Sequence, residues 1–253
     1  MGEPHAPERR DGHLLRILVK KLLSHSLLPA EDRQAIEALP FTVRTLEANE
    51  SIVREGSRTD SCAILLSGFA FRAKLSAEGG RQIVALKTPG DPLDLQSLFL
   101  PTADHSLQAL TRVELALVPH RAWNALLAAR PAVARAVVVD VLIEGSIGRE
   151  WLLNIGRRDA RTRVAHFLCE LVHRLNRVAL DRIETLEVPL TQEQLADLMG
   201  LTPVHINRTL KALEGEGAVA RVARRLHIAD LDRLAEIASF SSLYLHGHDA
   251  QAG

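Results

Sequence analysis

The chain has 253 residues, of which 47% are hydrophobic and 25% are charged, and its formal net charge is zero. This length can bury one or two cores, and the composition is that of an ordinary globular protein. No uninterrupted apolar run of about eighteen residues exists, which excludes a conventional membrane span, and a neutral chain can attract nucleic acid only through a local basic patch.

The first dozen residues, MGEPHAPERRDG, are polar and lack the apolar stretch of a signal peptide. We therefore predict a disordered leader over residues 1–13 and a cytoplasmic protein. Cys62 and Cys169 are the only cysteines. Two cysteines are too few for a disulfide framework or for an iron–sulfur cluster held by four cysteines of one chain.

Apolar residues at helical spacing predict two short packing helices, one over residues 14–23 and one in AEDRQAIEAL after Pro29. From about residue 41 to residue 119 the pattern changes to short apolar runs separated by turn sequences. The Gly79–Gly80 pair between FAFRAKL and RQIVALK predicts a hairpin. An all-β sandwich, roll or barrel is therefore expected, and we assign residues 14–128 to this domain.

One long helix is predicted from Pro131 to Ile155, where strand patterns are absent. Apolar residues from Val133 onward recur at the three and four spacing of a parallel coiled coil, so residues 129–156 are expected to dimerise the chain. The predicted seam consists of Val137, Val141, Glu144, Gly148, Trp151 and Ile155. The alternative is a simple core helix packed against the β domain.

Two further helices, joined by a tight turn, are predicted in TQEQLADLMGLTPVHINRTLKALEGEG. Thr191 and Gln194 form a Thr-x-x-Gln capping box at the start of the first helix, and Gly200 ends it. Thr202 caps the second helix, and Pro203 occupies its first position, where proline has no cost. A second helix with so defined a start is what a DNA-reading helix-turn-helix needs.

The second helix has an inner and an outer face. Ile206, Leu210 and Leu213 are spaced four and three apart and turn inward. The opposite face contains no acid; it carries Pro203, Val204, Asn207, Arg208 and Lys211. Such a polar and basic stripe is suited to the major groove of DNA.

The flanking segments complete a winged domain over residues 157–240. Asp159 is expected to cap a helix, and residues 154–159 are a candidate hinge. After the two central helices, AVARVA and RRLHIA predict two strands around a basic turn, which is a wing. A last helix near residues 231–239 and a flexible tail over residues 241–253 close the chain.

With a β domain, a long helix, a hinge and a winged helix-turn-helix in this order, the chain resembles the Crp/Fnr family of bacterial transcription regulators over nearly its whole length. The resemblance implies an α+β fold with an antiparallel, jelly-roll-like β-roll similar to cyclic nucleotide-binding domains. It also implies a homodimer that binds double-stranded DNA at a palindromic promoter site, under the control of an effector, and that contacts RNA polymerase if it is an activator.

The resemblance also marks an effector pocket, which departs from the family's pattern. Its candidate residues are Asp94, Leu95, His105 and Ser106. Leu95 and His105 stand where cyclic-AMP-binding members have a glutamate and an arginine. Neutral histidine offers little to a cyclic phosphate, and leucine cannot bind a ribose hydroxyl. We therefore predict no response to cyclic AMP and no iron–sulfur cluster, and leave open a constitutive DNA-binding dimer without an effector.

Base-reading roles follow from the same resemblance. Arg208 matches the family's guanine-reading arginine and can form a bidentate pair with a guanine. Val204 replaces a base-contacting glutamate and can contact a thymine methyl group, and Asn207 can pair with adenine. Contacts to DNA phosphates are expected from Thr202, His205, Lys211, Arg221, Arg224 and Arg225.

Other chemistry is weakly indicated. His166, Cys169 and His173 share one helix face and could hold zinc or haem, but packed core residues explain the pattern without a metal, so no metal or other cofactor is predicted. A cupin-like metalloenzyme is the rival class. It would need two or three histidines and a carboxylate on facing strands, and the β segment holds only His105. The chain is therefore predicted not to be an enzyme.

Overall fold

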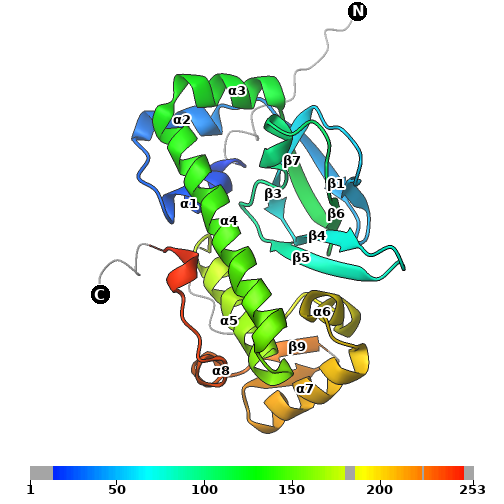
Figure 1. The fold of residues 1–253 in the computed structure, drawn as a ribbon. Coiled ribbons are helices and arrows are strands. Elements are labelled where there is room, and N and C mark those ends of the chain that lie inside the picture. Colours follow the sequence, from blue (N-terminus) through cyan, green and yellow to red (C-terminus); the bar gives the residue numbers. More distant parts are fainter. Residues whose placement is uncertain (1–13, 180–185, 224, 248–253) are drawn as a thin grey trace, which may run out of the picture.

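The computed structural model describes residues 14–179, 186–223 and 225–247. Within these ranges the chain has an antiparallel β domain, a long helix and a second, smaller domain, as predicted (Figure 1). The predicted leader and residues 248–253 of the predicted tail lie outside the described residues. No helix in the described ranges is apolar and long enough to cross a bilayer.

Two antiparallel sheets form the β domain. Their strand orders are β1-β7-β3, made of Thr42–Leu46, Val113–Pro119 and Ser61–Ser67, and β2-β6-β4-β5, made of Ser51–Val53, Ser106–Ala109, Ala70–Leu75 and Arg81–Lys87. Leu65, Leu107 and Leu115 fill the space between the sheets, because alternate side chains of each strand point inward. The hairpin between β4 and β5 is confirmed, and Gly79 adopts the positive φ of +84° that its turn requires.

Three helices cover the outer face of the first sheet: α1 (Arg16–Leu23), α2 (Ala30–Glu37) and α3 (His120–Ala129). They pack with the start of the long helix on Cys62, Ile64 and Val118, which point away from the roll interior. The two predicted packing helices are therefore confirmed as α1 and α2.

The long helix α4 (Pro131–Arg157) runs past the β domain to the smaller domain (Figure 1). Half of the predicted seam faces its own chain. Val137 is buried with α1 and α3, Glu144 pairs with Lys87 at 2.6 Å, and Trp151 meets Phe167 edge to face at 6.0 Å between ring centroids. These three side chains therefore make contacts within their own chain, and their predicted place in a seam with a second copy stays a prediction.

A different face of α4 is exposed. It carries an apolar strip made of Val138, Val141, Gly145, Gly148, Leu152 and Ile155, and Leu142 lies beside it. The strip keeps three and four spacing but is shifted by one residue at every other position. Because α4 is apolar on two faces, its sequence alone does not show which face packs on the β domain.

The smaller domain contains α5 (Ala160–Asn176), α6 (Gln192–Met199), α7 (Pro203–Gly215), the strands β8 (Val219–Val222) and β9 (Arg225–Ile228), and α8 (Leu231–Ala238). Its core extends into the β domain, since Phe71, Ile83 and Leu86 of β4 and β5 pack in the same cluster as α5. Figure 1 shows α6 beneath this hairpin. The two domains thus share one hydrophobic core in this arrangement.

The structure bears on two predicted flexible segments, the C-terminal tail and the candidate hinge. The tail is ordered through residue 247: Leu245 in η3 (Leu243–Leu245) is fully buried, and the Tyr244 hydroxyl donates to Glu170 at 2.9 Å. The prediction of a flexible tail is therefore wrong for residues 241–247. The candidate hinge is tied down, because the buried Arg163 guanidinium donates to the carbonyls of Ile155, Arg158 and Met199.

Candidate DNA interface

The helix-turn-helix begins with the predicted caps. The Thr191 hydroxyl accepts from the Gln194 N–H at 3.2 Å, and the Gln194 side chain accepts from the Thr191 N–H at 2.9 Å, which completes the capping box. Gly200 takes a left-handed φ of +63° at the turn. Thr202 then accepts from the His205 N–H, with Pro203 at the first position of α7. These local bonds fix where α7 starts.

The outer face of α7 is open to solvent. Ile206, Leu210 and Leu213 are buried, whereas Val204 is 81% exposed and Arg208 and Lys211 are exposed as well. Neither Arg208 nor Lys211 forms an ion pair with the part of the chain that the structure describes. Both cations are therefore available to DNA bases and phosphates. Thr202 is exposed and His205 is half-buried at the same end of the helix.

The wing contacts this face. Arg221 of β8 donates to Asn207 Oδ1 at 3.1 Å and lies 3.8 Å from Glu214, and Arg225 of β9 pairs with Glu187 at 2.7 Å. The Asn207 amide oxygen can accept two hydrogen bonds, so Arg221 can hold this side chain while its amide group stays able to pair with adenine. The predicted phosphate contact Arg224 lies outside the described residues.

The four effector candidates diverge in space. Asp94, Leu95 and His105 belong to the connection between β5 and β6, which includes η2 (Leu95–Leu98), and Ser106 is the first residue of β6. Leu95 lines a groove beside α4, whereas Asp94 lines a separate cavity at the end of the roll. His105 is buried with Nδ1 2.7 Å from Asp104, and the Ser106 hydroxyl accepts from the Glu55 N–H. The structure therefore does not gather them into one pocket.

The groove beside α4 has a volume of about 740 Å³ and is lined by β5, η2 and α4. Four cations line it, namely Lys21, Arg72, Lys87 and Arg174. Arg72 and Lys87 were not predicted from the sequence, because they alternate with apolar residues along their strands. Glu144 of α4 accepts from both, at 2.9 and 2.6 Å. Burial would raise the pKa of Glu144, but Lys87 and Arg72 outweigh it and hold this pKa at about 2. The acids that line the groove offset most of its positive charge, namely Asp91, Asp140 and Glu144.

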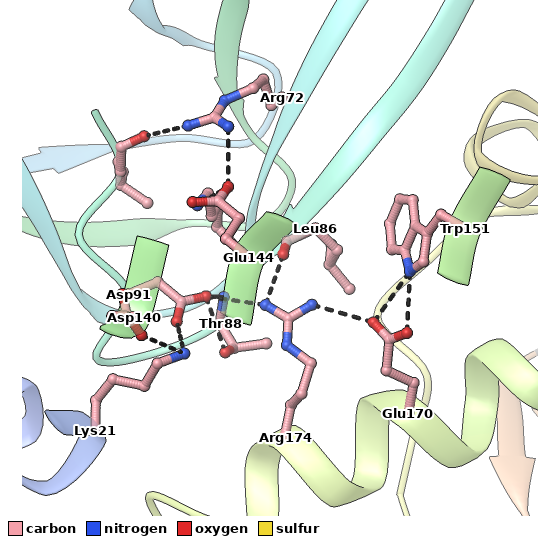
Figure 2. Close-up of polar contacts among 12 residues, drawn as sticks. Lys21, Arg72, Leu86, Thr88, Asp91, Asp140, Glu144, Trp151, Glu170 and Arg174 are labelled. Carbon is pink, nitrogen blue, oxygen red and sulfur yellow. Dashed lines mark hydrogen bonds and ion pairs between the residues drawn. The ribbon is translucent and has the colours of Figure 1, made fainter. Parts of the chain in front are cut away.

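A buried charge network joins the domains (Figure 2). Arg174 of α5 donates to Asp91 at 3.0 Å, to the Leu86 carbonyl at 2.8 Å and to Glu170 at 3.4 Å. Asp91 also accepts from Lys21 of α1 at 2.5 Å. Burial alone would raise the pKa of Asp91, but Lys21 and Arg174 lower it well below its ordinary value.

The network continues to α4 and the tail. Glu170 accepts from the Trp151 indole at 3.0 Å and from the Tyr244 hydroxyl at 2.9 Å. Burial raises the pKa of Glu170 even though Arg174 opposes this shift. Since the joined groups come from α1, the β5–β6 connection, α4, α5 and η3, the network holds the smaller domain against the β domain.

The candidate metal ligands serve packing in this structure. His166 lies 3.2 Å from the Asn154 amide and 3.3 Å from Glu150, and its ring stacks on Tyr244. Cys169 is fully buried, and burial raises the pKa of its thiol to about 12. No group of three or more histidine, cysteine or acidic residues in the described ranges is placed to hold a metal ion.

Comparison with known proteins adds two family matches. Residues 43–130 match the cyclic nucleotide-binding domain, and residues 162–237 match the Crp-like helix-turn-helix domain. The chain is 30% identical over 217 residues to the nitrogen fixation regulation protein FixK of Bradyrhizobium diazoefficiens, which covers 85% of this chain and 89% of that protein. It is 26% identical over 217 residues to the transcriptional activator protein FnrL of Cereibacter sphaeroides, covering 84% of this chain and 86% of FnrL.

A solved structure agrees with these matches. The structure of FixK2 from Bradyrhizobium japonicum superposes with a TM-score of 0.70 at 25% sequence identity, covering 79% of this chain and 98% of the FixK2 chain. The similarity therefore includes the β domain, the long helix and the winged domain together.

Proposed function

The chain belongs to the Crp/Fnr family of transcription regulators, and on that premise we propose that it binds a palindromic promoter site as a homodimer. Its relatives are regulators of transcription rather than enzymes, so the metalloenzyme alternative has no support. The observation that carries the proposal is the exposed face of α7 from Val204 to Lys211, whose charged side chains Arg208 and Lys211 are both basic. Two threonine caps set the starts of α6 and α7, and a basic wing flanks this face.

Dimerisation is supported by the exposed strip on α4. Leu152 is 72% exposed and Leu142 is 63% exposed, and aliphatic side chains left in water along a long helix favour association. Gly145 and Gly148 in the middle of the strip allow two helices to approach closely. A twofold dimer presents two α7 helices related by symmetry, which requires a palindromic site.

Arg208 is proposed to read one guanine in each half-site, with Val204 against a thymine methyl group and Asn207 on adenine. Lys211, Thr202, His205 and the wing arginines, including Arg221 and Arg225, are proposed to hold phosphates. Phosphate contacts add affinity that falls with salt but carry no sequence information. Several relatives are named transcriptional activators. If this chain also activates transcription, we propose that it contacts RNA polymerase.

The effector is proposed to be neither cyclic AMP nor an iron–sulfur cluster. His105 is buried, and burial lowers its pKa although Asp104 opposes the shift, so it offers no fixed positive charge. Arg72 and Lys87 are already engaged by Glu144. Cys62 and Cys169 lie in separate cores. Calorimetry that shows specific micromolar binding of cyclic AMP would overturn the first exclusion.

The direct test compares Arg208→Ala with Lys211→Ala on an operator selected from a random duplex pool. Arg208→Ala should cost about 1–3 kcal/mol on the operator and little on random DNA. Lys211→Ala should weaken both duplexes alike and reduce the salt dependence. Equal losses on both duplexes for Arg208→Ala would contradict the reading role.

The dimer is tested separately by sedimentation. Leu152→Glu places a charge in the strip and should yield monomers that bind a full operator poorly. Leu27→Glu changes an equally apolar side chain, 86% exposed in the connection between α1 and α2, and should remain dimeric. A dimeric Leu152→Glu protein would show that the strip is not the interface.

A further inference from the structure

A second cavity lies at the open end of the β-roll. Its volume is about 500 Å³, within the range of small-molecule sites. Apolar side chains from both sheets and the β5–β6 connection form its walls, namely Ile52, Val53, Ala63, Leu93 and Leu117. This cavity is distinct from the groove beside α4, because no described residue lines both.

Asp94 is a buried acid that lines this cavity and has no side-chain hydrogen bond within the described part of the chain. Asp94 is 2% exposed, and neither of its carboxylate oxygens accepts a hydrogen bond from any described residue. Its side chain does not cap η2, although it stands at the capping position. The Thr59 hydroxyl, which also lines the cavity, has no partner among the described residues either. A buried carboxylate without hydrogen bonds is costly, so this position favours a ligand that donates.

The mouth of the cavity carries the opposite charge. Arg44 and Arg58 line it and are exposed, and neither forms an ion pair or side-chain hydrogen bond within the described part of the chain. Asp60 is the third charged group at the mouth. Two free guanidinium groups offer a planar set of donors to a carboxylate or a phosphate.

We propose that this cavity binds a small zwitterion, whose ammonium group donates to Asp94 and whose anionic group is held by Arg44 and Arg58. The apolar walls between the two ends accommodate an aliphatic or aromatic body. As an effector the ligand would act within the proposed regulatory function, but its binding does not depend on DNA. Inorganic anions and cyclic nucleotides lack the ammonium group and are not expected to satisfy Asp94.

The site is positioned to affect the domain contact. Asp94 follows Asp91 by three residues, and Asp91 pairs with Arg174 of α5. The connection between them is held to β3, since the Leu93 N–H donates to the Ala63 carbonyl at 2.8 Å. A ligand that donates a hydrogen bond to Asp94 therefore binds the same short segment that holds the DNA-binding domain through Asp91.

The test is calorimetry and thermal denaturation of the full chain without DNA, using the proteinogenic L-amino acids and phosphoethanolamine as probes at up to millimolar concentration. At least one probe should bind saturably and raise the Tm. Amino acids and phosphoethanolamine separate a carboxylate from a phosphate at the mouth. For each probe that binds, its N-acetyl derivative should bind at least about tenfold more weakly, since it loses the charged donor.

Variants identify the site. Asp94→Asn and the double change Arg44→Gln with Arg58→Gln should each raise Kd by about tenfold or more. Asp60→Asn, the control at the mouth, should bind at least as tightly as the native chain. The proposal fails if no probe binds, or if N-acetylation and Asp94→Asn both leave Kd unchanged. Normal operator binding by the same preparation would show that such a failure leaves the proposed DNA-binding function intact.

Discussion

Arg174→Met should destabilise the contact between the domains. The Arg174 side chain is only 7% exposed and donates to Asp91, Glu170 and the Leu86 carbonyl. Methionine keeps the length and the apolar part of the side chain while removing the charge and all three bonds (Figure 2). The change therefore tests the network rather than the packing of α5.

The size of the loss in unfolding free energy depends on which partners Asp91 and Glu170 keep in the variant. Breaking a buried ion pair by removing one partner costs about 3–5 kcal/mol, because the other charge stays buried. Asp91 keeps Lys21 at 2.5 Å and the Thr88 N–H at 2.7 Å, and Glu170 keeps Trp151 and Tyr244. We therefore expect a loss near the lower end, about 3 kcal/mol in the free energy of unfolding.

Urea denaturation at fixed protomer concentration, followed by circular dichroism and by tryptophan fluorescence, measures this loss. Arg233→Met is the matched control, since Arg233 pairs with Glu236 on the surface of α8 and both side chains are exposed. That change should cost less than about 1 kcal/mol. In a double-mutant cycle with Asp91→Asn, the coupling should be about 1–3 kcal/mol. A loss for Arg174→Met no larger than for Arg233→Met would refute the structural role of the network.

The pH dependence should reveal the pair between α4 and the β domain: with its pKa held at about 2, Glu144 contributes stability above its ordinary pKa, and this contribution is lost as the pH falls toward 2. The difference in unfolding free energy between the native chain and Glu144→Gln should therefore shrink in acid, and a constant difference across this range would contradict the pairing. Thr191→Ala should cost about 1 kcal/mol by removing the cap of α6, whereas Thr45→Ala on the exposed edge of β1 should cost less in the same urea assay; equal losses would argue against the capping box.

Local chemistry explains why the DNA-binding helices could be predicted. Thr191, Gln194 and Gly200 act within a few residues of one another, so spacing along the chain is enough to place the caps and the turn. The exposed side of α7 follows in the same way from the burial of Ile206 and Leu210. The part of the candidate site that depends on helix periodicity is therefore visible in the sequence.

Contacts between distant segments explain what was missed. Arg174 and Asp91 are 83 positions apart, so the network has no local pattern. The strip on α4 does have helical spacing, but α4 is apolar on two faces, so spacing alone does not show which face stays exposed. Trp151 illustrates the difficulty, because its place in a heptad suits a dimer seam, yet its indole bonds Glu170 within the same chain. Only the packing of α5 beside α4 decides between the two.

The connection between β5 and β6 brings these features together. Its buried Asp91 holds α5 through Arg174, its Asp94 lines the cavity of the roll, and its Leu95 lines the groove beside α4. Because a ligand shifts an equilibrium only by its differential affinity for two arrangements, a regulator needs an element that senses the ligand and also contacts the DNA-binding domain. This segment meets both conditions within five residues, whereas no residue of α7 lines the groove or the cavity. Control of DNA binding in this chain is therefore expected to act through the docking of α5, with the outer face of α7 unchanged.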